Sequence, residues 1–133
     1  MTGSERTILY VDDDADDREF FFEVMKETDP QIDVVFAENG VEALQYLENR
    51  KNSSLPCLVV LDINMPLLDG KETFQRMRGD TALKNLPVVV LSSSEKPDDK
   101  EMFNNLGIDF FTKPSNINYL NDIAGHMVKV CCR

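Results

Sequence analysis

Several residue types that define other classes of protein are scarce in this chain. It has no tryptophan, one histidine and three cysteines among 133 residues. The cysteines lack the Cys-x-x-Cys spacing of a zinc site, and their odd number argues against a disulfide scaffold. We therefore expect them to be small apolar residues in or near a core. They are Cys57, Cys131 and Cys132.

Long apolar runs and an excess of basic charge are missing as well. No run of about eighteen apolar residues is present, and the polar N-terminus lacks the apolar segment of a signal peptide. The net charge of −10 would repel a phosphate backbone. These features predict a cytoplasmic protein with no direct binding to nucleic acid or membrane. The length suits a single domain over residues 1–133, with a core at about 7–130.

Short apolar runs alternate along the chain with segments of helical periodicity. The runs predict strands at residues 7–11, 32–37, 58–61, 87–91 and 109–112. The segments between and after them predict five helices. Strands and helices that alternate in this way form a parallel sheet with helices on both faces. We expect one α/β domain.

The third predicted strand, Leu58–Leu61, is apolar at every position, which is typical of a central strand covered on both faces. Asp62 follows it directly. It should therefore lie at the carboxyl end of a buried strand, where open α/β sheets place their ligand sites. Pro66 then ends the strand, and Asp69 suits the N-cap of the next helix.

Polar side chains also follow the other predicted strands. Asp12 and Asp13 follow the first, Ser92 the fourth and Lys113 the fifth. In a doubly wound sheet these ends share one crevice with Asp62. Clustered carboxylates would repel one another without a cation, which implies a hard divalent ion, and magnesium is the usual one when phosphate is a further ligand. A hydroxyl and an ammonium group suit phosphoryl oxygens, and an aspartate can accept the group as an acyl phosphate.

These residues resemble those of a response regulator receiver domain of two-component signalling, of the stand-alone chemotaxis-regulator type. The resemblance covers about residues 7–130. It rests on four motifs in order: ILYVDD (8–13), LDINMPLLDG (61–70), VVLSS (89–93) and FFTKP (110–114). It implies a flavodoxin-like fold, with five parallel strands in the order 2-1-3-4-5 and five helices.

The resemblance also implies roles for the crevice residues. Asp62 matches the phosphoacceptor, and Ser92 and Lys113 match the residues that hold phosphoryl oxygens. The implied Mg²⁺ ligands are Asp12, Asp13, Asp62 and the backbone carbonyl of Asn64. The family takes its phosphoryl group from a sensor histidine kinase or a histidine phosphotransfer protein and acts on a downstream protein. It is a signalling switch with slow self-catalysed phosphotransfer and dephosphorylation rather than an enzyme.

Further positions match the switching elements of the family. Ser92 and Phe110 match the switch pair, and the face built from the fourth helix, fifth strand and fifth helix would carry the output. Asn64 and Ser94 match positions that tune phosphate lifetime. The Lys113–Pro114 bond should be cis. Ser92 replaces the more frequent threonine, and the acidic run continues through three further residues, Asp14, Asp16 and Asp17.

Three alternatives fit parts of the pattern. A haloacid-dehalogenase-type phosphohydrolase also uses an Asp-x-Asp after a strand, but no Thr or Val stands two residues further on and a cap domain has no room. A degenerate receiver would act only as a binding module. Residues 12–23 match some ligand positions of an EF-hand, but Asp17 stands where glycine is needed.

Overall fold

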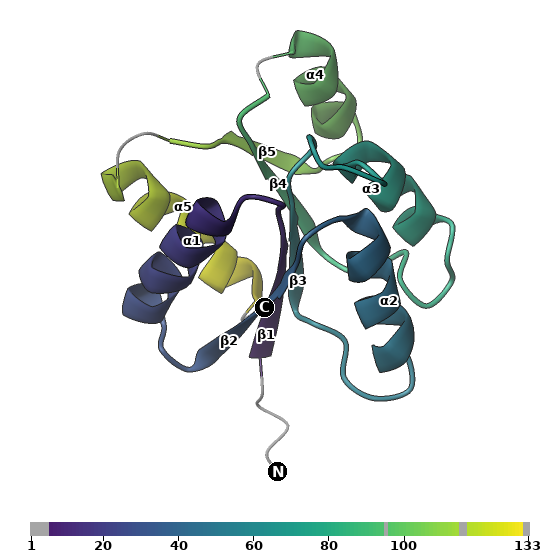
Figure 1. Ribbon diagram of the computed structural model, residues 1–133, viewed down its shortest axis with the longest axis horizontal. Coiled ribbons are helices and arrows are strands. Elements are labelled where there is room, and N and C mark those ends of the chain that lie inside the picture. The colour runs from purple at the N-terminus through teal and green to yellow at the C-terminus, as the bar shows by residue number, and fades with distance from the viewer. Residues whose placement is uncertain (1–5, 95, 115–116, 132–133) are drawn as a thin grey trace.

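The computed structural model describes residues 6–94, 96–114 and 117–131, and in these residues five strands alternate with five helices (Figure 1). The strands are β1 (Arg6–Val11), β2 (Ile32–Ala37), β3 (Leu58–Leu61), β4 (Val88–Ser92) and β5 (Asp109–Thr112). The helices are α1 (Ala15–Thr28), α2 (Gly40–Arg50), α3 (Gly70–Arg78), α4 (Pro97–Asn105) and α5 (Ile117–Cys131). The expected alternation is confirmed.

All strand pairs are parallel, and the order in the sheet is β2-β1-β3-β4-β5. This is the predicted order. The last residue of β1, Val11, pairs with Ala37 of β2 and Leu61 of β3. The strands therefore end in register, and the residues that follow them emerge together at one edge of the sheet, formed by the carboxyl ends of its strands.

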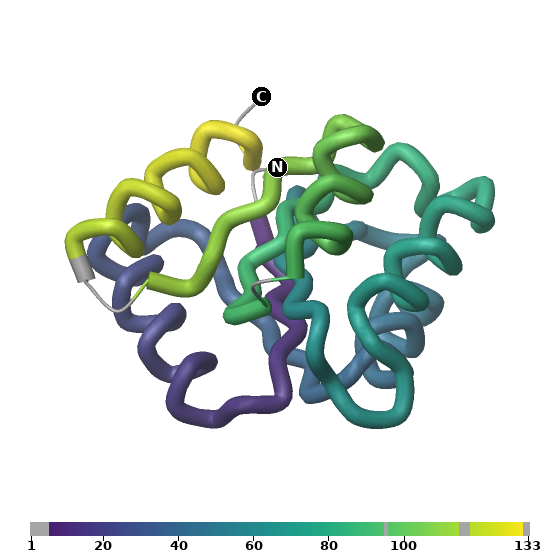
Figure 2. The backbone as a smooth tube through the Cα atoms, turned by 90° about the horizontal axis from the view of Figure 1, so that it is seen from above, coloured from purple at the N-terminus to yellow at the C-terminus, as the bar shows by residue number. Residues whose placement is uncertain are grey.

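The sheet separates two hydrophobic cores. Side chains alternate along β1, so that Leu9 and Val11 face the core under α2, α3 and α4, while Ile8 and Tyr10 face the core under α1 and α5. Viewed from above, the two groups of helices lie on opposite sides of the strands (Figure 2). The apolar strand β3 is buried along its whole length because both faces are covered. None of the described helices has the length and apolar character needed to span a bilayer.

Side-chain caps define where three helices begin: Asp14 caps α1, Asn39 caps α2 and Asp69 caps α3. Asp69 caps α3 by accepting from the Glu72 amide at 2.9 Å, which confirms the expected N-cap. Asp14 caps α1 by accepting from the backbone of Asp16 and Asp17. Residues 15–28 are therefore helical where an EF-hand would need a coiled calcium loop, which excludes that alternative.

Gly70 allows α3 to begin directly against the end of β3. A Cβ atom at this position would lie 2.2 Å from the carbonyl oxygen of Asp62 and 2.8 Å from the Cα of Ile63. The Gly70 amide instead donates a hydrogen bond of 2.9 Å to the Ile63 carbonyl. The absence of a side chain thus brings the first turn of α3 next to Asp62.

The expectation of unpaired cysteines is wrong for two of the three. Cys57 and Cys131 are paired as a disulfide, with Cα atoms 5.0 Å apart and a separation of 74 positions in sequence. Cys57 is half-buried just before β3, and the last turn of α5 packs against that end of the sheet. Folding therefore brings together two residues that no spacing rule relates. Cys132 lies outside the described residues.

Candidate functional site

Backbone hydrogen bonds position the residues that follow the strands. The Asp62 amide donates to the last carbonyl of β1 at 3.0 Å, and the Asp12 amide donates to the last carbonyl of β2 at 3.0 Å. The Lys113 amide donates to the Ser92 carbonyl at 2.9 Å. The backbone hydrogen bonding between neighbouring strands thus continues by one residue beyond β1, β3 and β5. The residues expected to meet do meet, because their backbones remain paired with neighbouring strands.

Three carboxylates gather at this edge. Asp12, Asp13 and Asp62 each present an oxygen within 4.8 Å of the other two, with Asp12 and Asp62 buried and Asp13 exposed. Hard oxygen donors at this separation fit a divalent cation such as Mg²⁺. Asn64 lies beside them, since its amide is 3.4 Å from Oδ1 of Asp62, and its side chain is exposed.

Asp62 is a buried carboxylate with a side-chain partner on each of its two oxygens. It is 4% exposed, its Oδ1 accepts a hydrogen bond of 2.7 Å from the Ser92 hydroxyl, and its Oδ2 lies 3.1 Å from Nζ of Lys113. Burial raises the pKa of Asp62, whereas the Ser92 hydrogen bond and the Lys113 charge lower it. Both oxygens of a buried carboxylate therefore face groups that also suit phosphoryl oxygens.

Lys113 contacts three carboxylates at once. Its Nζ lies 2.7 Å from Oδ2 of Asp12 and 2.7 Å from Oδ2 of Asp17, in addition to its contact with Asp62. Burial alone would lower the pKa of Lys113, but the hydrogen bonds to Asp12 and Asp17 raise it above the ordinary value. Asp17 was not among the predicted site residues. Its place in the first turn of α1 is the signal that could have located it, since that turn faces the crevice.

Tyr10 is a second residue that the sequence pattern missed. Its hydroxyl donates a hydrogen bond of 2.6 Å to Oδ2 of Asp12, and its ring stacks on Phe21 at 4.3 Å between centroids. Both Tyr10 and Asp12 are almost fully buried. Burial, followed by the charge of Asp12, raises the pKa of Tyr10, so the hydroxyl keeps its proton and remains a donor. The sequence signal that could have located Tyr10 is its phenol hydroxyl, which stands within an otherwise apolar strand.

The predicted switch and lifetime residues border the site in different ways. Phe110 is half-buried and packs against Phe103 of α4, with ring centroids 6.2 Å apart. Ser94 is buried, and its hydroxyl donates a hydrogen bond of 3.0 Å to Asp99. The Ser94 side chain therefore contacts the start of α4, while its amide contacts Ser92 at 3.2 Å.

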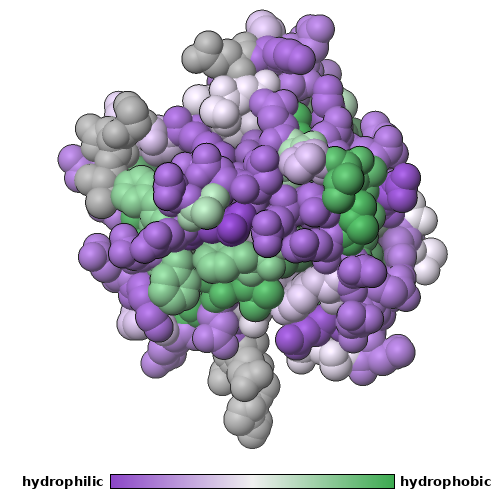
Figure 3. All heavy atoms as spheres, viewed as in Figure 1, coloured by the Kyte–Doolittle hydropathy of each residue, from purple (hydrophilic) through white to green (hydrophobic). Residues whose placement is uncertain are grey.

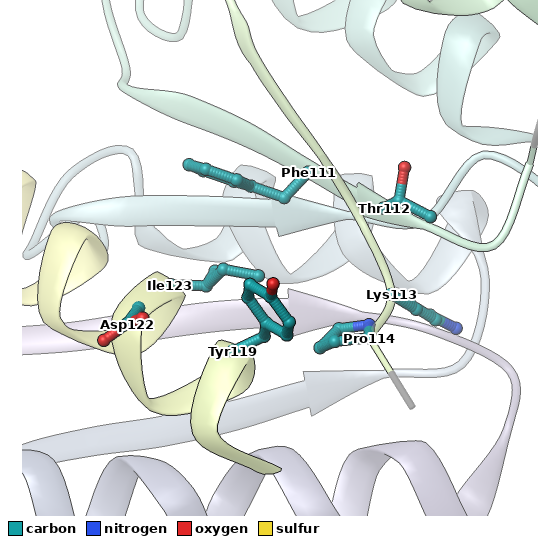
Figure 4. A pocket seen from close by; sticks show the side chains of 7 residues that line it. All are labelled: Phe111, Thr112, Lys113, Pro114, Tyr119, Asp122 and Ile123. Atoms are coloured by element: carbon teal, nitrogen blue, oxygen red, sulfur yellow. The ribbon is translucent and has the colours of Figure 1, made fainter. Parts of the chain in front are cut away.

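The expected cis bond before Pro114 is wrong. No peptide bond between described residues is cis, so Lys113–Pro114 is trans. Lys113 nevertheless reaches the carboxylates, since its side chain points away from Tyr119 and from the cleft between β5 and α5 (Figure 4). That cleft has a volume of about 770 Å³. The backbone pairing of Lys113 with β4, rather than a bend at the proline, aims its ammonium group at the crevice.

The face seen in Figure 3 is largely hydrophilic, with apolar areas beside α1 and β2 and near the start of α2. Phe22 of α1 packs against Phe36 of β2, with ring centroids 6.2 Å apart. Phe36 is 38% exposed and Val41, at the start of α2, is 45% exposed.

A family model agrees with this fold and site. The model described as the response regulator receiver domain matches residues 8–124. The chain belongs to this family. Receiver domains accept phosphoryl groups from histidine kinases, so the haloacid-dehalogenase alternative loses its basis. Asp14, the second aspartate of the Asp-x-Asp, caps α1 instead of facing the crevice.

Individual relatives support the same assignment. Response regulator Rcp1 of Synechocystis sp. is 31% identical over 119 residues, which cover 86% of this chain and 81% of Rcp1. The structure of the phosphorylated cyanobacterial phytochrome response regulator RcpA superposes with a TM-score of 0.85 at 31% identity, covering 97% of this chain and 95% of RcpA. The Mn²⁺-bound form of Rcp1 superposes with a TM-score of 0.80 at 29% identity, covering 92% of this chain and 91% of Rcp1.

Other relatives are much longer than this chain. Response regulator Rre1 of Synechocystis sp. is 32% identical, and the match covers 92% of this chain but 51% of Rre1. A protein-glutamate methylesterase of Bacillus subtilis is 36% identical, and the match covers 29% of it. The receiver domain therefore occurs in proteins with different further parts.

Proposed function

We propose that this chain is a phosphorylation-dependent switch that accepts a phosphoryl group on Asp62 from a histidine kinase or a histidine phosphotransfer protein. One observation carries the proposal: the buried Asp62 carboxylate faces both Ser92 and Lys113, beside two further carboxylates. We further propose that residues 1–133 act as one receiver domain in the cytoplasm.

In the proposed reaction an oxygen of Asp62 attacks the phosphorus of a phosphohistidine. The new P–O bond forms as the P–N bond breaks, and the imidazole of the donor leaves with the electron pair of that bond. Lys113 and the Ser92 hydroxyl, now in contact with Asp62, would hold the oxygens of the transferred group. Hydrolysis of the acyl phosphate by water then resets the switch slowly.

Mg²⁺ is the proposed cofactor, held by the three carboxylates and by the backbone carbonyl of Asn64. When bound, it would offset negative charge on the phosphoryl oxygens. The donor set supports this assignment, since hard carboxylate oxygens of Asp12, Asp13 and Asp62 lie within 4.8 Å of one another. The existence of a Mn²⁺-bound form of the relative Rcp1 supports the binding of a divalent ion.

We propose that the output surface is formed by α4, β5 and α5. Phe110 lies on β5, where it pairs with Val90 of β4, and packs against Phe103 of α4. A shallow cavity of about 330 Å³ borders it and is lined partly by Lys96 and Lys100. A movement of Ser92 toward a phosphoryl group would change the space available to Phe110, and the altered surface would bind a downstream protein.

Incubation with a small acyl phosphate and Mg²⁺ tests the acceptor directly. The expected product is an acid-stable, base-labile phosphoprotein whose formation requires the metal. Asp62→Asn removes the nucleophile and should abolish labelling, whereas Asp33→Asn, an exposed aspartate on β2, should label like the wild type. Equal labelling of Asp62→Asn would refute the assignment, and absence of labelling in the wild type would favour a degenerate binding module. Turnover of phosphomonoesters would favour a hydrolase.

A further inference from the structure

A chain of hydrogen bonds leaves the site through Ser92 and ends on α3. The Ser92 hydroxyl donates to Asp62, and the Ser94 amide donates to the oxygen of that hydroxyl at 3.2 Å. The Ser94 hydroxyl in turn donates to Oδ2 of Asp99 at 3.0 Å. The other oxygen of Asp99 accepts from Nζ of Lys71 at 2.9 Å. These contacts span from β4 to α4 and on to α3.

Asp99 is the centre of this network and is only 5% exposed. An acidic residue in the first turn of a helix can serve simply to complement the helix dipole, and that role needs no burial and no partner. Asp99 differs because both of its oxygens are engaged by side chains from outside α4. The Lys71 hydrogen bond, opposed by burial, lowers the pKa of Asp99, so its carboxylate remains charged.

The network closes into a ring that includes the acceptor Asp62, because the backbone at the start of α3 returns to the end of β3. Lys71 follows Gly70, whose amide is bonded to the Ile63 carbonyl and which has no room for a Cβ next to Asp62. The backbone of Lys71 therefore begins next to the end of β3. From that anchor the ring returns through Asp99 and the two serines to the carboxylate of Asp62.

We propose that Asp99 and Lys71 are positioning residues for the phosphorylation of Asp62. They hold Ser94 so that its amide orients the Ser92 oxygen and the Ser92 hydroxyl donates toward the acceptor. This inference rests on the proposed function, since it concerns the rate of that reaction. A hydroxyl that already points at the acceptor is preorganised for the transfer step, and its later movement toward the bound phosphoryl group starts from this rotamer. Loss of the ring lets Ser92 leave this rotamer and slows phosphoryl transfer.

The first arm of the test measures phosphorylation by a small acyl phosphate at saturating Mg²⁺. Asp99→Asn and Lys71→Met should each lower the rate constant by about tenfold, as expected for the loss of one hydrogen bond to a charged group. Lys71→Arg keeps the cation and should restore most of the rate. The double variant should be no slower than either single variant, because both break the same ring. The Mg²⁺ affinity should not change.

The control for the Lys71–Asp99 pair is a second lysine–aspartate ion pair far from the acceptor. Lys51 and Asp80 form an ion pair at the opposite edge of the sheet, next to the C-terminal ends of α2 and α3. Asp80→Asn and Lys51→Met should leave the rate constant unchanged. Wild-type rates in Asp99→Asn and Lys71→Met, or an equal fall in the control variants, would overturn the proposal. Lys71 has a side chain that is 37% exposed, so its replacement should preserve the fold if Asp99→Asn does not.

The second arm needs no phosphoryl donor and separates this inference from the proposed function. Amide chemical shifts of Ser92 and Ser94 should change in Asp99→Asn and in Lys71→Met, and remain as in the wild type in Asp80→Asn. Unchanged shifts in the first two variants would overturn the coupling even if the wild type is phosphorylated. A wild type that is not labelled, with shifts that do change, would refute the proposed function and leave the ring intact.

Discussion

Replacing Asp13 by Asn should stabilise the metal-free protein, although most substitutions destabilise a fold. Asp13 presents an oxygen within 4.8 Å of oxygens of Asp12 and Asp62. With Asp17, the crevice contains four carboxylates against the one ammonium group of Lys113. Removal of one negative charge without a change in shape therefore relieves repulsion.

The magnitude follows from the separation and the exposure. Two like charges 4.8 Å apart repel by about 3.5 kcal/mol at an effective dielectric constant near 20 and by about 0.9 kcal/mol in water. Asp13 is exposed, so the lower value applies to each of its two pairs, and attraction to Lys113 offsets part of the sum. The expected gain is about 1 kcal/mol, which raises the melting temperature by roughly 3 to 5 °C for a chain of this size.

Thermal melts in chelator and in millimolar Mg²⁺ measure this effect. Magnesium should stabilise the wild type by mass action, by about 1.4 kcal/mol in the free energy of unfolding at ten times the dissociation constant, and so raise its melting temperature. Asp13→Asn has lost a ligand and should respond much less. The difference between the melting temperatures of Asp13→Asn and the wild type should therefore shrink or change sign when the metal is added.

Asp16→Asn is the matched control, because Asp16 belongs to the same acidic run but points to solvent in the first turn of α1. Its loss should lower stability by a few tenths of a kcal/mol, since a negative charge favours a helix N-terminus. A lower melting point for Asp13→Asn in chelator, or equal stabilisation of both proteins by magnesium, would show that Asp13 is not part of this site.

Three further predictions concern neighbouring features. Tyr10→Phe keeps the stacked ring but removes the hydrogen bond to Asp12, and should cost about 1 to 3 kcal/mol in chemical denaturation; an unchanged midpoint would show that the bond contributes nothing. Because burial raises the pKa of Asp62 while the Ser92 hydrogen bond lowers it, the rate of labelling by an acyl phosphate should increase with pH as the carboxylate ionises, and Ser92→Ala should move this profile to higher pH. A profile that stays in place or moves to lower pH contradicts this cause. Reduction with dithiothreitol should lower the wild-type melting temperature, with a loss of up to about 4 kcal/mol for a disulfide that spans 74 positions, and should leave Cys57→Ser unaffected. The same response in both proteins would exclude the pairing.

The sequence by itself determined the elements of this protein and the edge at which its polar residues meet. Apolar runs at β1, β3 and β4 and capping residues such as Asp69 act over a few neighbouring positions, so they could be identified from the printed chain. Because parallel strands end at a common edge, Asp62 and Lys113 could be placed together without coordinates, although 51 positions separate them.

Only the tertiary structure decided which of several available partners each of these groups contacts. Tyr10, Asp17 and Asp99 each carry a polar group in a segment that local pattern explains as strand or helix, and their partners depend on how the layers pack. The disulfide and the trans bond before Pro114 are of the same kind, since neither local spacing nor the motif required them. The physical reason is range: secondary structure is set by contacts between near neighbours, whereas the contacts of a buried polar group are set by whichever distant segments the two cores bring to within hydrogen-bonding distance.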